Sequence, residues 1–277
     1  MSDADFSLFT SLRYDVDLKR VPAKGLQYAG WNYHNDSPFY MLDFHRDRIL
    51  RAATHWQWKE AVENFSGDEA LPRLAKMAQD FIGPSETKPL RLKILVDSKG
   101  TISFERFDTP ISPFGNLLPE RLTPPETAAG PNEPQVPPCY TLVVDGSPIA
   151  RSEFTHYKTT RRATYDAARS RARIGPYDTL KEVLIINQDD KTVMEGSTTT
   201  PYFWRDGRWI TPPVSAQFSW QDGSGGHDGT TRRWALERGL AVEQVVPVDS
   251  LTEGEECWIS SGVCGFRRAV VRLTKDN

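Results

Sequence analysis

The sequence predicts a mixed α/β (α+β) protein built from two domains. Its 277 residues exceed the usual size of one domain, and strand-like and helix-like hydrophobic patterns alternate along the chain. Nine of the 20 prolines fall within residues 109–138, where the periodicity disappears. Proline lacks an amide donor and fixes φ, so this stretch cannot form the interior of a sheet. We therefore expect a small N-terminal domain over 1–108, a proline-rich connection over 109–138 and a larger C-terminal domain over 139–277.

The composition excludes several classes of protein. With 38% hydrophobic residues the chain can bury a sizeable core, and a net charge of −3 argues against wholesale binding of nucleic acid. No apolar run is long enough to span a membrane, and the first residues lack the pattern of a secretion signal. The three cysteines are odd in number and form no Cys-x-x-Cys pair, which favours neither disulfides nor a metal site. We expect a cytoplasmic protein.

The N-terminal part begins with strand composition and then changes period. An amphipathic stripe from Leu42 to Trp56 predicts one helix, and a second is expected to end at Gly83-Pro84. Alternating apolar residues on either side of a polar turn predict a hairpin with one buried face. The expected elements are strands over 6–14 and 38–43, helices from 44 and over 68–81, and paired strands over 90–96 and 102–104.

The C-terminal part contains a second set of strands and two helices. Asp206-Gly207 lies between aromatic and β-branched residues, which is the strongest short-range signal for a hairpin. A glycine-rich loop then opens a helix that is expected to end at Gly239. The expected elements are strands over 139–145, 182–187, 193–195, 242–248, 257–260 and 266–273, a helix over 160–173, and the hairpin over 201–213.

Three features are candidates for a chemical role. Lys158 stands just before a helix, Glu195 ends a strand ahead of small residues, and Gly229-Thr230-Thr231 opens a helix. Each has an ordinary alternative, namely a solvated lysine, a solvated glutamate on a surface hairpin, and a simple turn. Together they supply what pyridoxal phosphate requires: an amine for its aldehyde, a carboxylate for its ring nitrogen and backbone amides for its phosphate.

The spacing of these features is also that of a known family. The matching residues include Lys158, Tyr165, Glu195-Gly196-Ser197, Thr211-Pro212-Pro213 and Gly229-Thr230-Thr231-Arg232, and an N-terminal His45-x-x-Arg48-Ile49. The chain resembles the class IV (fold-type IV) pyridoxal-phosphate enzymes, which include aminotransferases and aminodeoxychorismate lyases. The family's usual Asn after Glu-Gly-Ser is replaced here by Thr199 or Thr200, and its N-terminal Asp and double-glycine segment is missing.

The resemblance implies a role for each matching residue. Lys158 would bind the cofactor covalently and move the proton, as the catalytic residue. Glu195 would contact the ring nitrogen, while Arg48, Thr230 and Thr231 would hold the phosphate. Tyr165 and Ser261 are further cofactor-binding candidates. The family also implies a cofactor in the cleft between the two domains and a homodimer.

Within the family, two segments look most like the fungal type of 4-amino-4-deoxychorismate lyase. These are Phe6–Asp15 and Lys158-Thr159-Thr160-Arg161. Such an enzyme releases pyruvate and forms p-aminobenzoate for folate biosynthesis. Its substrate carries two carboxylates, for which Arg13 and Arg161 are the candidate partners. A transaminase acting on branched-chain amino acids, D-amino acids or amines is the alternative, and a non-catalytic binding protein on the same fold is the third interpretation.

Overall fold

A computed structural model describes residues 5–125, 139–175 and 180–273, and the chain divides into two compact units. Unit 1 comprises Met1–Pro113, Tyr157–Arg161 and Gly262–Cys264, and unit 2 comprises Phe114–His156, Arg162–Ser261 and Gly265–Asn277. Residues 126–138 of the expected proline-rich connection lie outside the described residues. The domain boundaries expected near 108 and 139 stay predictions.

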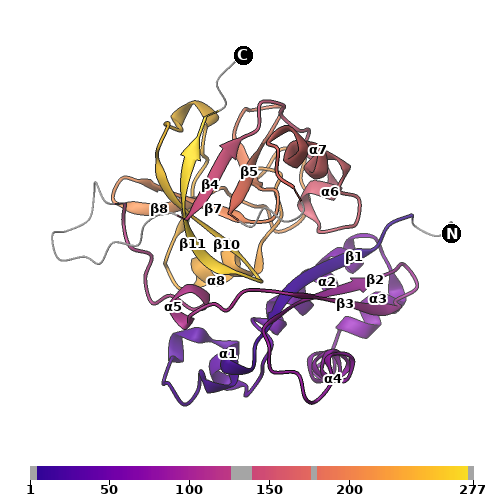
Figure 1. Cartoon of the computed structure of the whole chain (residues 1–277). Helices are drawn as coiled ribbons and strands as arrows, with labels where there is room; N and C mark the ends of the chain where they lie inside the picture. The colour runs from indigo at the N-terminus through magenta and orange to yellow at the C-terminus, as the bar shows by residue number, and fades with distance from the viewer. Residues whose placement is uncertain (1–4, 126–138, 176–179, 274–277) are drawn as a thin grey trace. The chain divides into compact units, whose positions relative to one another are not determined.

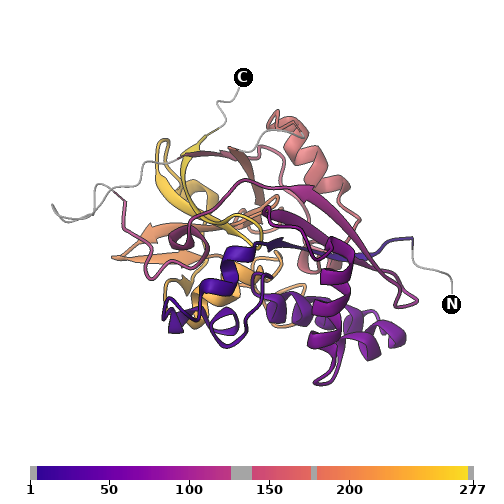
Figure 2. The same cartoon turned by 60° about the horizontal axis from the view of Figure 1, so that its bottom comes forward.

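Unit 1 is built on an antiparallel sheet with the order β1-β2-β3. Alternate residues, including Leu8, Leu12, Leu92 and Ile94, are buried because successive side chains point to opposite faces. Helices α2 and α4 pack beside this sheet (Figures 1 and 2). The bounds are β1 Leu8–Tyr14, η1 Val16–Arg20, η2 Gln27–Ala29, α1 Trp31–His34, α2 Leu42–His55, α3 Lys59–Phe65, α4 Ala70–Ile82, β2 Leu90–Val96 and β3 Ile102–Asp108.

The strand expected over 38–43 is wrong. Phe39 makes a single bridge to Tyr14, and Met41, at φ 52°, caps α2. The segment hydrogen-bonds to β1 on one side, but the left-handed backbone of Met41 ends this pairing and α2 begins at the next residue. On the other side, the buried side chain of Asn32 donates to the carbonyl of Phe39 (2.9 Å) and accepts from the amide of Met41 (2.9 Å). One side chain therefore satisfies backbone groups that a partner strand would otherwise take.

Unit 2 contains a mixed sheet of eight strands with the order β6-β5-β4-β11-β10-β7-β8-β9. Helix α7 lies beside β5 (Figure 1). Along β5, Val183 and Ile185 pack against α7, while Leu184 and Ile186 enter a second core lined by β10 and β11. The bounds are α5 Phe114–Leu117, β4 Tyr140–Val144, α6 Glu153–His156, α7 Ala163–Arg171, β5 Lys181–Ile186, β6 Val193–Gly196, β7 Thr200–Arg205, β8 Arg208–Thr211, α8 Thr230–Glu237, β9 Val242–Glu243, η4 Val248–Ser250, β10 Glu256–Ser261 and β11 Gly265–Arg272.

Local turn chemistry decides where the elements of unit 2 end. The predicted hairpin at Asp206-Gly207 is confirmed, and both residues have positive φ (49° and 77°), as a tight primed turn requires. The strand expected over 242–248 is wrong beyond Glu243, because Val246 pairs with Val193 instead and Pro247 has no amide to donate. Helix α7 starts later than expected, since Thr160 donates its amide to Ser7.

Candidate functional site

Lys158 lies in unit 1, on a short segment that extends the sheet beyond β1. The amide of Phe9 donates to the carbonyl of Lys158 (3.0 Å), and Leu8 forms an antiparallel bridge with Thr159. Lys158 is half-buried, and its Nζ lies 5.0 Å from the centroid of the Phe9 ring. Residues far apart in sequence thus fix the backbone of this lysine against a buried strand.

Arg48 is linked to the same strand through Thr10. The guanidinium of Arg48 donates to Thr10 Oγ1, which lies 2.5 Å from Nδ1 of the fully buried His45. A guanidinium can only donate, so the hydroxyl proton of Thr10 points to His45 Nδ1. Nδ1 also lies 3.4 Å from Arg48 Nη2, which is another donor. Nδ1 therefore faces donors and acts as an acceptor. We therefore assign His45 as the neutral tautomer with its proton on Nε2.

The electrostatics of His45 agree with this assignment. Burial lowers the pKa of His45 well below its usual value of 6.5, and the positive charges of Arg48 and Lys158 lower it further. The imidazole is therefore uncharged at neutral pH. A neutral His45 beside two cations leaves this part of unit 1 with a positive charge, which suits an anionic ligand.

Glu195 lies in unit 2, buried at the end of β6. The hydroxyl of Tyr165 donates to Glu195 Oε1 (2.5 Å), and Nδ1 of His227 lies 2.7 Å from Glu195 Oε2. Burial raises the pKa of Tyr165 well above its usual value, and the adjacent Glu195 raises it further, so this phenol remains a donor. A carboxylate offers about four lone-pair sites, so Glu195 can still accept an N–H from a protonated ring.

The turn after Glu195 is fixed by a second buried carboxylate, that of Glu182. Its Oε1 accepts from the amide of Val183 (2.8 Å) and the hydroxyl of Ser197 (2.5 Å). Its Oε2 accepts from the amide (3.0 Å) and the hydroxyl (2.5 Å) of Thr198. A Cβ on Gly196 would collide with the side chain of Thr199, so this position of the turn has little room for a side chain.

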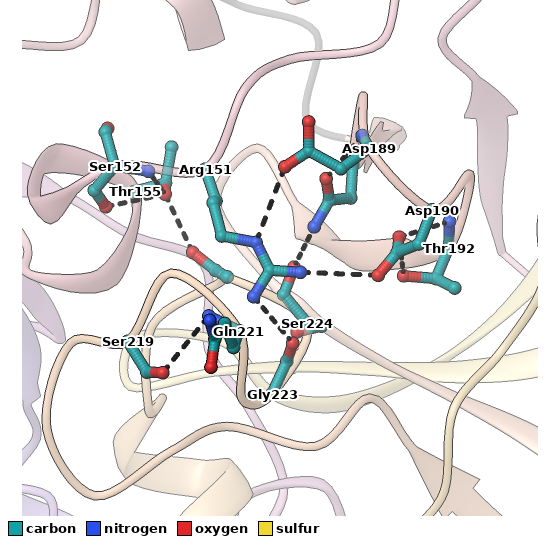
Figure 3. Close-up of polar contacts among 12 residues, drawn as sticks. Arg151, Ser152, Thr155, Asp189, Asp190, Thr192, Ser219, Gln221, Gly223 and Ser224 are labelled. Carbon is teal, nitrogen blue, oxygen red and sulfur yellow. Dashed lines mark hydrogen bonds and ion pairs between the residues drawn. The ribbon is translucent and has the colours of Figure 1, made fainter.

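A buried arginine fixes the glycine-rich loop before α8 (Figure 3). Nη1 of Arg151 donates to the carbonyl of Gly223 (3.2 Å), and its Nη2 donates to Oδ2 of Asp190 (3.3 Å). The hydroxyl of Thr155 donates to the carbonyl of Gly225 (2.7 Å). A Cβ on Gly226 would lie 2.8 Å from the carbonyl of Met194, so the loop packs directly on β6. This packing brings His227 to Glu195.

Helix α8 starts immediately after this loop. Gly229 is its N-cap, in an extended conformation and without a side-chain hydrogen bond to the first turn. The amides of such a turn are a suitable site for a phosphate. The hydroxyl of Thr231 lies 2.8 Å from that of Ser260, which in turn lies 2.8 Å from that of Tyr202. Burial raises the pKa of Tyr202, so it remains protonated.

The structure therefore places the predicted residues in two groups. Lys158 and Arg48 lie in unit 1, together with Arg13 and Arg161, whereas Tyr165, Glu195, Thr230, Thr231 and Ser261 lie in unit 2. Ser261 is half-buried at the end of β10.

Both predicted substrate arginines have protein partners. Arg13 is fully buried, and its guanidinium binds Asp15 (2.8 Å) and the carbonyl of Pro110 (2.9 Å). Arg161 is exposed for 46% of its side chain, where it pairs with Asp5 and lies over the ring of Phe6. Their proposed contact with substrate stays a prediction.

Three contributors were not predicted from the sequence, namely Thr10, Glu182 and His227. A signal existed for Glu182, since a charged residue opens an otherwise apolar strand. Among the described residues, no group of three or more His, Cys, Asp or Glu side chains is arranged to hold a metal ion. In the same ranges no helix has the length and apolar character needed to cross a membrane.

Comparison with known proteins gives the family. The model of the class IV amino-transferases matches residues 28–270. The aminodeoxychorismate lyase of Saccharomyces cerevisiae is 29% identical over 148 residues, which are 48% of this chain and only 37% of the yeast protein.

Solved structures show the same fold. The branched-chain amino acid aminotransferase of Escherichia coli superposes with a TM-score of 0.61 at 16% identity, covering 97% of this chain and 77% of the other. A hypothetical aminotransferase of Mycobacterium tuberculosis, solved with α-ketoglutarate and PMP bound, gives 0.59 at 14% identity, covering 98% and 83%. Because the family model matches residues 28–270, which is most of its length, the chain belongs to the class IV aminotransferase family.

Proposed function

We propose that the chain is a pyridoxal-phosphate-dependent 4-amino-4-deoxychorismate lyase, which releases pyruvate and forms p-aminobenzoate for folate biosynthesis. The observation that carries the proposal is the 29% identity with the yeast aminodeoxychorismate lyase. That protein is matched over about a third of its length, so its activity comes to this chain as a proposal. The resemblance of Phe6–Asp15 and of Lys158–Arg161 to the fungal lyases supports the same assignment.

The cofactor follows from the family, whose members depend on pyridoxal phosphate. The donor sets of the two units suit its chemical groups. The amine of Lys158 suits its aldehyde, the carboxylate of Glu195 suits its ring nitrogen, and the start of α8 with Arg48 suits its phosphate. When bound, the cofactor supplies an electron sink for the carbon from which the substrate proton leaves.

The chain's own residues have distinct tasks in this proposal. Lys158 would hold the cofactor through Nζ, and the same amine would take the proton from the substrate. Glu195 would accept the N–H of the cofactor ring and would keep that ring protonated. Tyr165 and His227 orient the Glu195 carboxylate through both of its oxygens. His45 remains neutral, so that Arg48 and Lys158 are the charges that meet the phosphate and the substrate.

The cofactor assignment is tested by spectroscopy. Lys158→Ala should abolish the visible absorbance of bound cofactor that borohydride bleaches in the wild type. Lys76→Ala, at an exposed position on α4, should leave that absorbance unchanged. Glu195→Gln should still bind cofactor but lose most activity, because a neutral amide does not hold the ring nitrogen protonated. Borohydride labelling of Lys93 or Lys181 instead would contradict the assignment.

The reaction is tested by turnover without a keto acid. With 4-amino-4-deoxychorismate alone, the lyase should release pyruvate and p-aminobenzoate over many turnovers, because one half-reaction restores the enzyme. A transaminase would stop after one turnover, with the cofactor aminated. Multiple turnovers with amino-acid and keto-acid pairs, and none with aminodeoxychorismate, would overturn the lyase proposal and support the transaminase. Cofactor binding without either reaction would support a binding protein.

We also propose that the chain works as a homodimer, because this family builds its site at a dimer interface. Sedimentation velocity or light scattering of the cofactor-loaded protein should give about twice the mass of the chain. A monomer at micromolar concentration would contradict this proposal.

A further inference from the structure

Four successive carbonyl groups at the start of the glycine-rich loop accept hydrogen bonds from side chains. They belong to residues 222–225, and the donors are the guanidinium of Arg151, the side-chain amide of Asn187 and the hydroxyl of Thr155. Figure 3 shows Arg151 and Thr155 directed at this segment. The distances are 3.4 Å from Arg151 to Asp222, 3.2 Å from Arg151 to Gly223, 3.0 Å from Asn187 to Ser224 and 2.7 Å from Thr155 to Gly225. Side chains from outside the loop therefore fix its backbone.

Arg151 makes two of these bonds and also binds the turn between β5 and β6. Its Nη2 lies 3.3 Å from Oδ2 of Asp190, and its Nε lies 3.8 Å from Oδ2 of Asp189 (Figure 3). Oδ1 of Asp190 in turn accepts from the amide (3.1 Å) and the hydroxyl (2.7 Å) of Thr192, just before β6. A guanidinium presents its N–H donors in one rigid plane, so the buried Arg151 binds the turn and the loop at once. Arg151 therefore couples the loop to the strand that carries Glu195.

Two glycines let the loop pass closely between Arg151 and β6. Gly225 has a φ of 89°, and a Cβ on it would lie 2.7 Å from the Cβ of Arg151. Gly226 packs with similar closeness on the backbone of β6. His227 follows immediately, and its Nδ1 lies 2.7 Å from Oε2 of Glu195. Because successive Cα atoms stay about 3.8 Å apart, a shift of Gly225 would displace His227 as well.

We propose that Arg151 is a positioning residue for the ring nitrogen of the cofactor, acting through the glycine-rich loop and His227 on Glu195. The inference rests on the proposed cofactor site and adds to it a residue that does not touch the cofactor. An ionised carboxylate only accepts, so His227 presents an N–H to Glu195 through Nδ1. Such a bond favours the ionised form of Glu195, which is the form that holds the ring nitrogen protonated. Loss of Arg151 releases the loop and moves this donor away, so Glu195 binds the ring N–H less strongly.

The test compares two cofactors that differ only at the ring nitrogen. The apoprotein is titrated with pyridoxal phosphate and with 1-deazapyridoxal phosphate, in which a C–H replaces that nitrogen, and the absorbance gives each Kd. The wild type should bind pyridoxal phosphate at least about 10-fold more tightly, as expected of one hydrogen bond between charged groups. Arg151→Met should reduce this preference to about 3-fold or less, through loss of affinity for pyridoxal phosphate. Arg272→Met removes an exposed arginine that pairs with Glu253 in the same unit, and it should keep the preference.

A double variant shows whether Arg151 acts through His227. His227→Ala should lower the same preference, and adding Arg151→Met should lower it no further, because residues that act through one contact are not additive. Arg151→Lys replaces the Met variant if the latter does not fold. Its ammonium keeps a positive charge beside Asp190 but cannot also bind the loop carbonyls, so it too should lose most of the preference.

The inference is overturned by an Arg151 variant that keeps the wild-type preference, including one that loses affinity equally for both cofactors, which is the result of a merely structural role. Additive losses in the double variant overturn the route through His227. A wild type that binds both cofactors equally overturns the proposed contact of Glu195 with the ring nitrogen, and the inference with it. Absence of pyruvate release overturns the lyase reaction alone, because the binding comparison requires no turnover.

Discussion

Replacement of Glu182 should destabilise unit 2 more than replacement of any exposed carboxylate does. Glu182 is 1% exposed, and its carboxylate accepts four hydrogen bonds. One comes from Val183, one from Ser197 and two from Thr198. Glu182→Ala removes the acceptor of all four donors, and those of Val183 and Ser197 belong to fully buried residues. Removing one member of a buried charged network costs about 3–5 kcal/mol, and we expect about 4 kcal/mol here.

Glu182→Gln separates the charge from the shape. An amide keeps one accepting oxygen but turns an NH₂ group toward the donors on the other side. The hydroxyls of Ser197 and Thr198 can rotate to accept, whereas a backbone N–H cannot. The expected loss is therefore about half of that for Glu182→Ala, or roughly 2 kcal/mol.

The assay is urea unfolding followed by circular dichroism and tryptophan fluorescence, with Glu237→Gln as the control. Glu237 is 47% exposed and pairs with Arg233 on α8, so its loss should change the unfolding free energy by less than about 0.5 kcal/mol. The reasoning is refuted if Glu182→Ala unfolds within 1 kcal/mol of the wild type, roughly the value of one ordinary hydrogen bond. It is also refuted if Glu182→Gln is the more damaging change.

Three further predictions concern unit 1 and the cysteines. Thr10→Val removes the acceptor of Arg48 and should weaken cofactor binding about 10-fold in an absorbance titration, whereas Thr10→Ser should not; equal affinities would contradict the link. Because the pKa of folded His45 lies well below 6.5, only the unfolded chain takes up its proton as the pH falls below 6.5, so stability present above that pH is lost on acidification. His45→Asn should flatten this part of the pH–stability curve, and an unchanged curve would refute the assignment. Burial raises the pKa of the Cys257 thiol, so mass spectrometry after alkylation of the folded protein should find the exposed Cys139 labelled and Cys257 intact; early labelling of Cys257 would contradict its burial.

The sequence was most informative where short-range physics decides the structure. The Asp206-Gly207 turn requires positive φ at two successive residues, and few other pairs adopt it readily. The class of the fold follows likewise from hydrophobic periods that repeat over many residues. Lys158 and Glu195 were singled out by their local sequence as well as by the resemblance to a family, whereas Arg48 came from that resemblance alone. Their joint use in one site stays a prediction.

What the sequence could not supply are pairings between distant side chains. Asn32 replaces a partner strand for Phe39, and His227 meets Glu195 only because the glycine-rich loop packs on β6. No local pattern encodes such contacts. The apolar pattern from Val242 onward also predicted a longer strand than the two residues of β9. Such a pattern does not reveal whether a neighbouring strand is available for pairing.

The discontinuity of unit 1 along the chain has a consequence for synthesis. Strand β1 is translated before Tyr157–Arg161 and Gly262–Cys264, yet one of its edges is covered by Tyr157–Arg161, and the amide of Arg13 donates to the carbonyl of Gly262. An uncovered strand edge is a template for wrong pairing. The sheet of unit 1 therefore cannot be completed until these later segments have been translated. A gene fragment that stops at Pro113 would encode a sheet with an exposed edge, and such a fragment is a poor choice for separate expression.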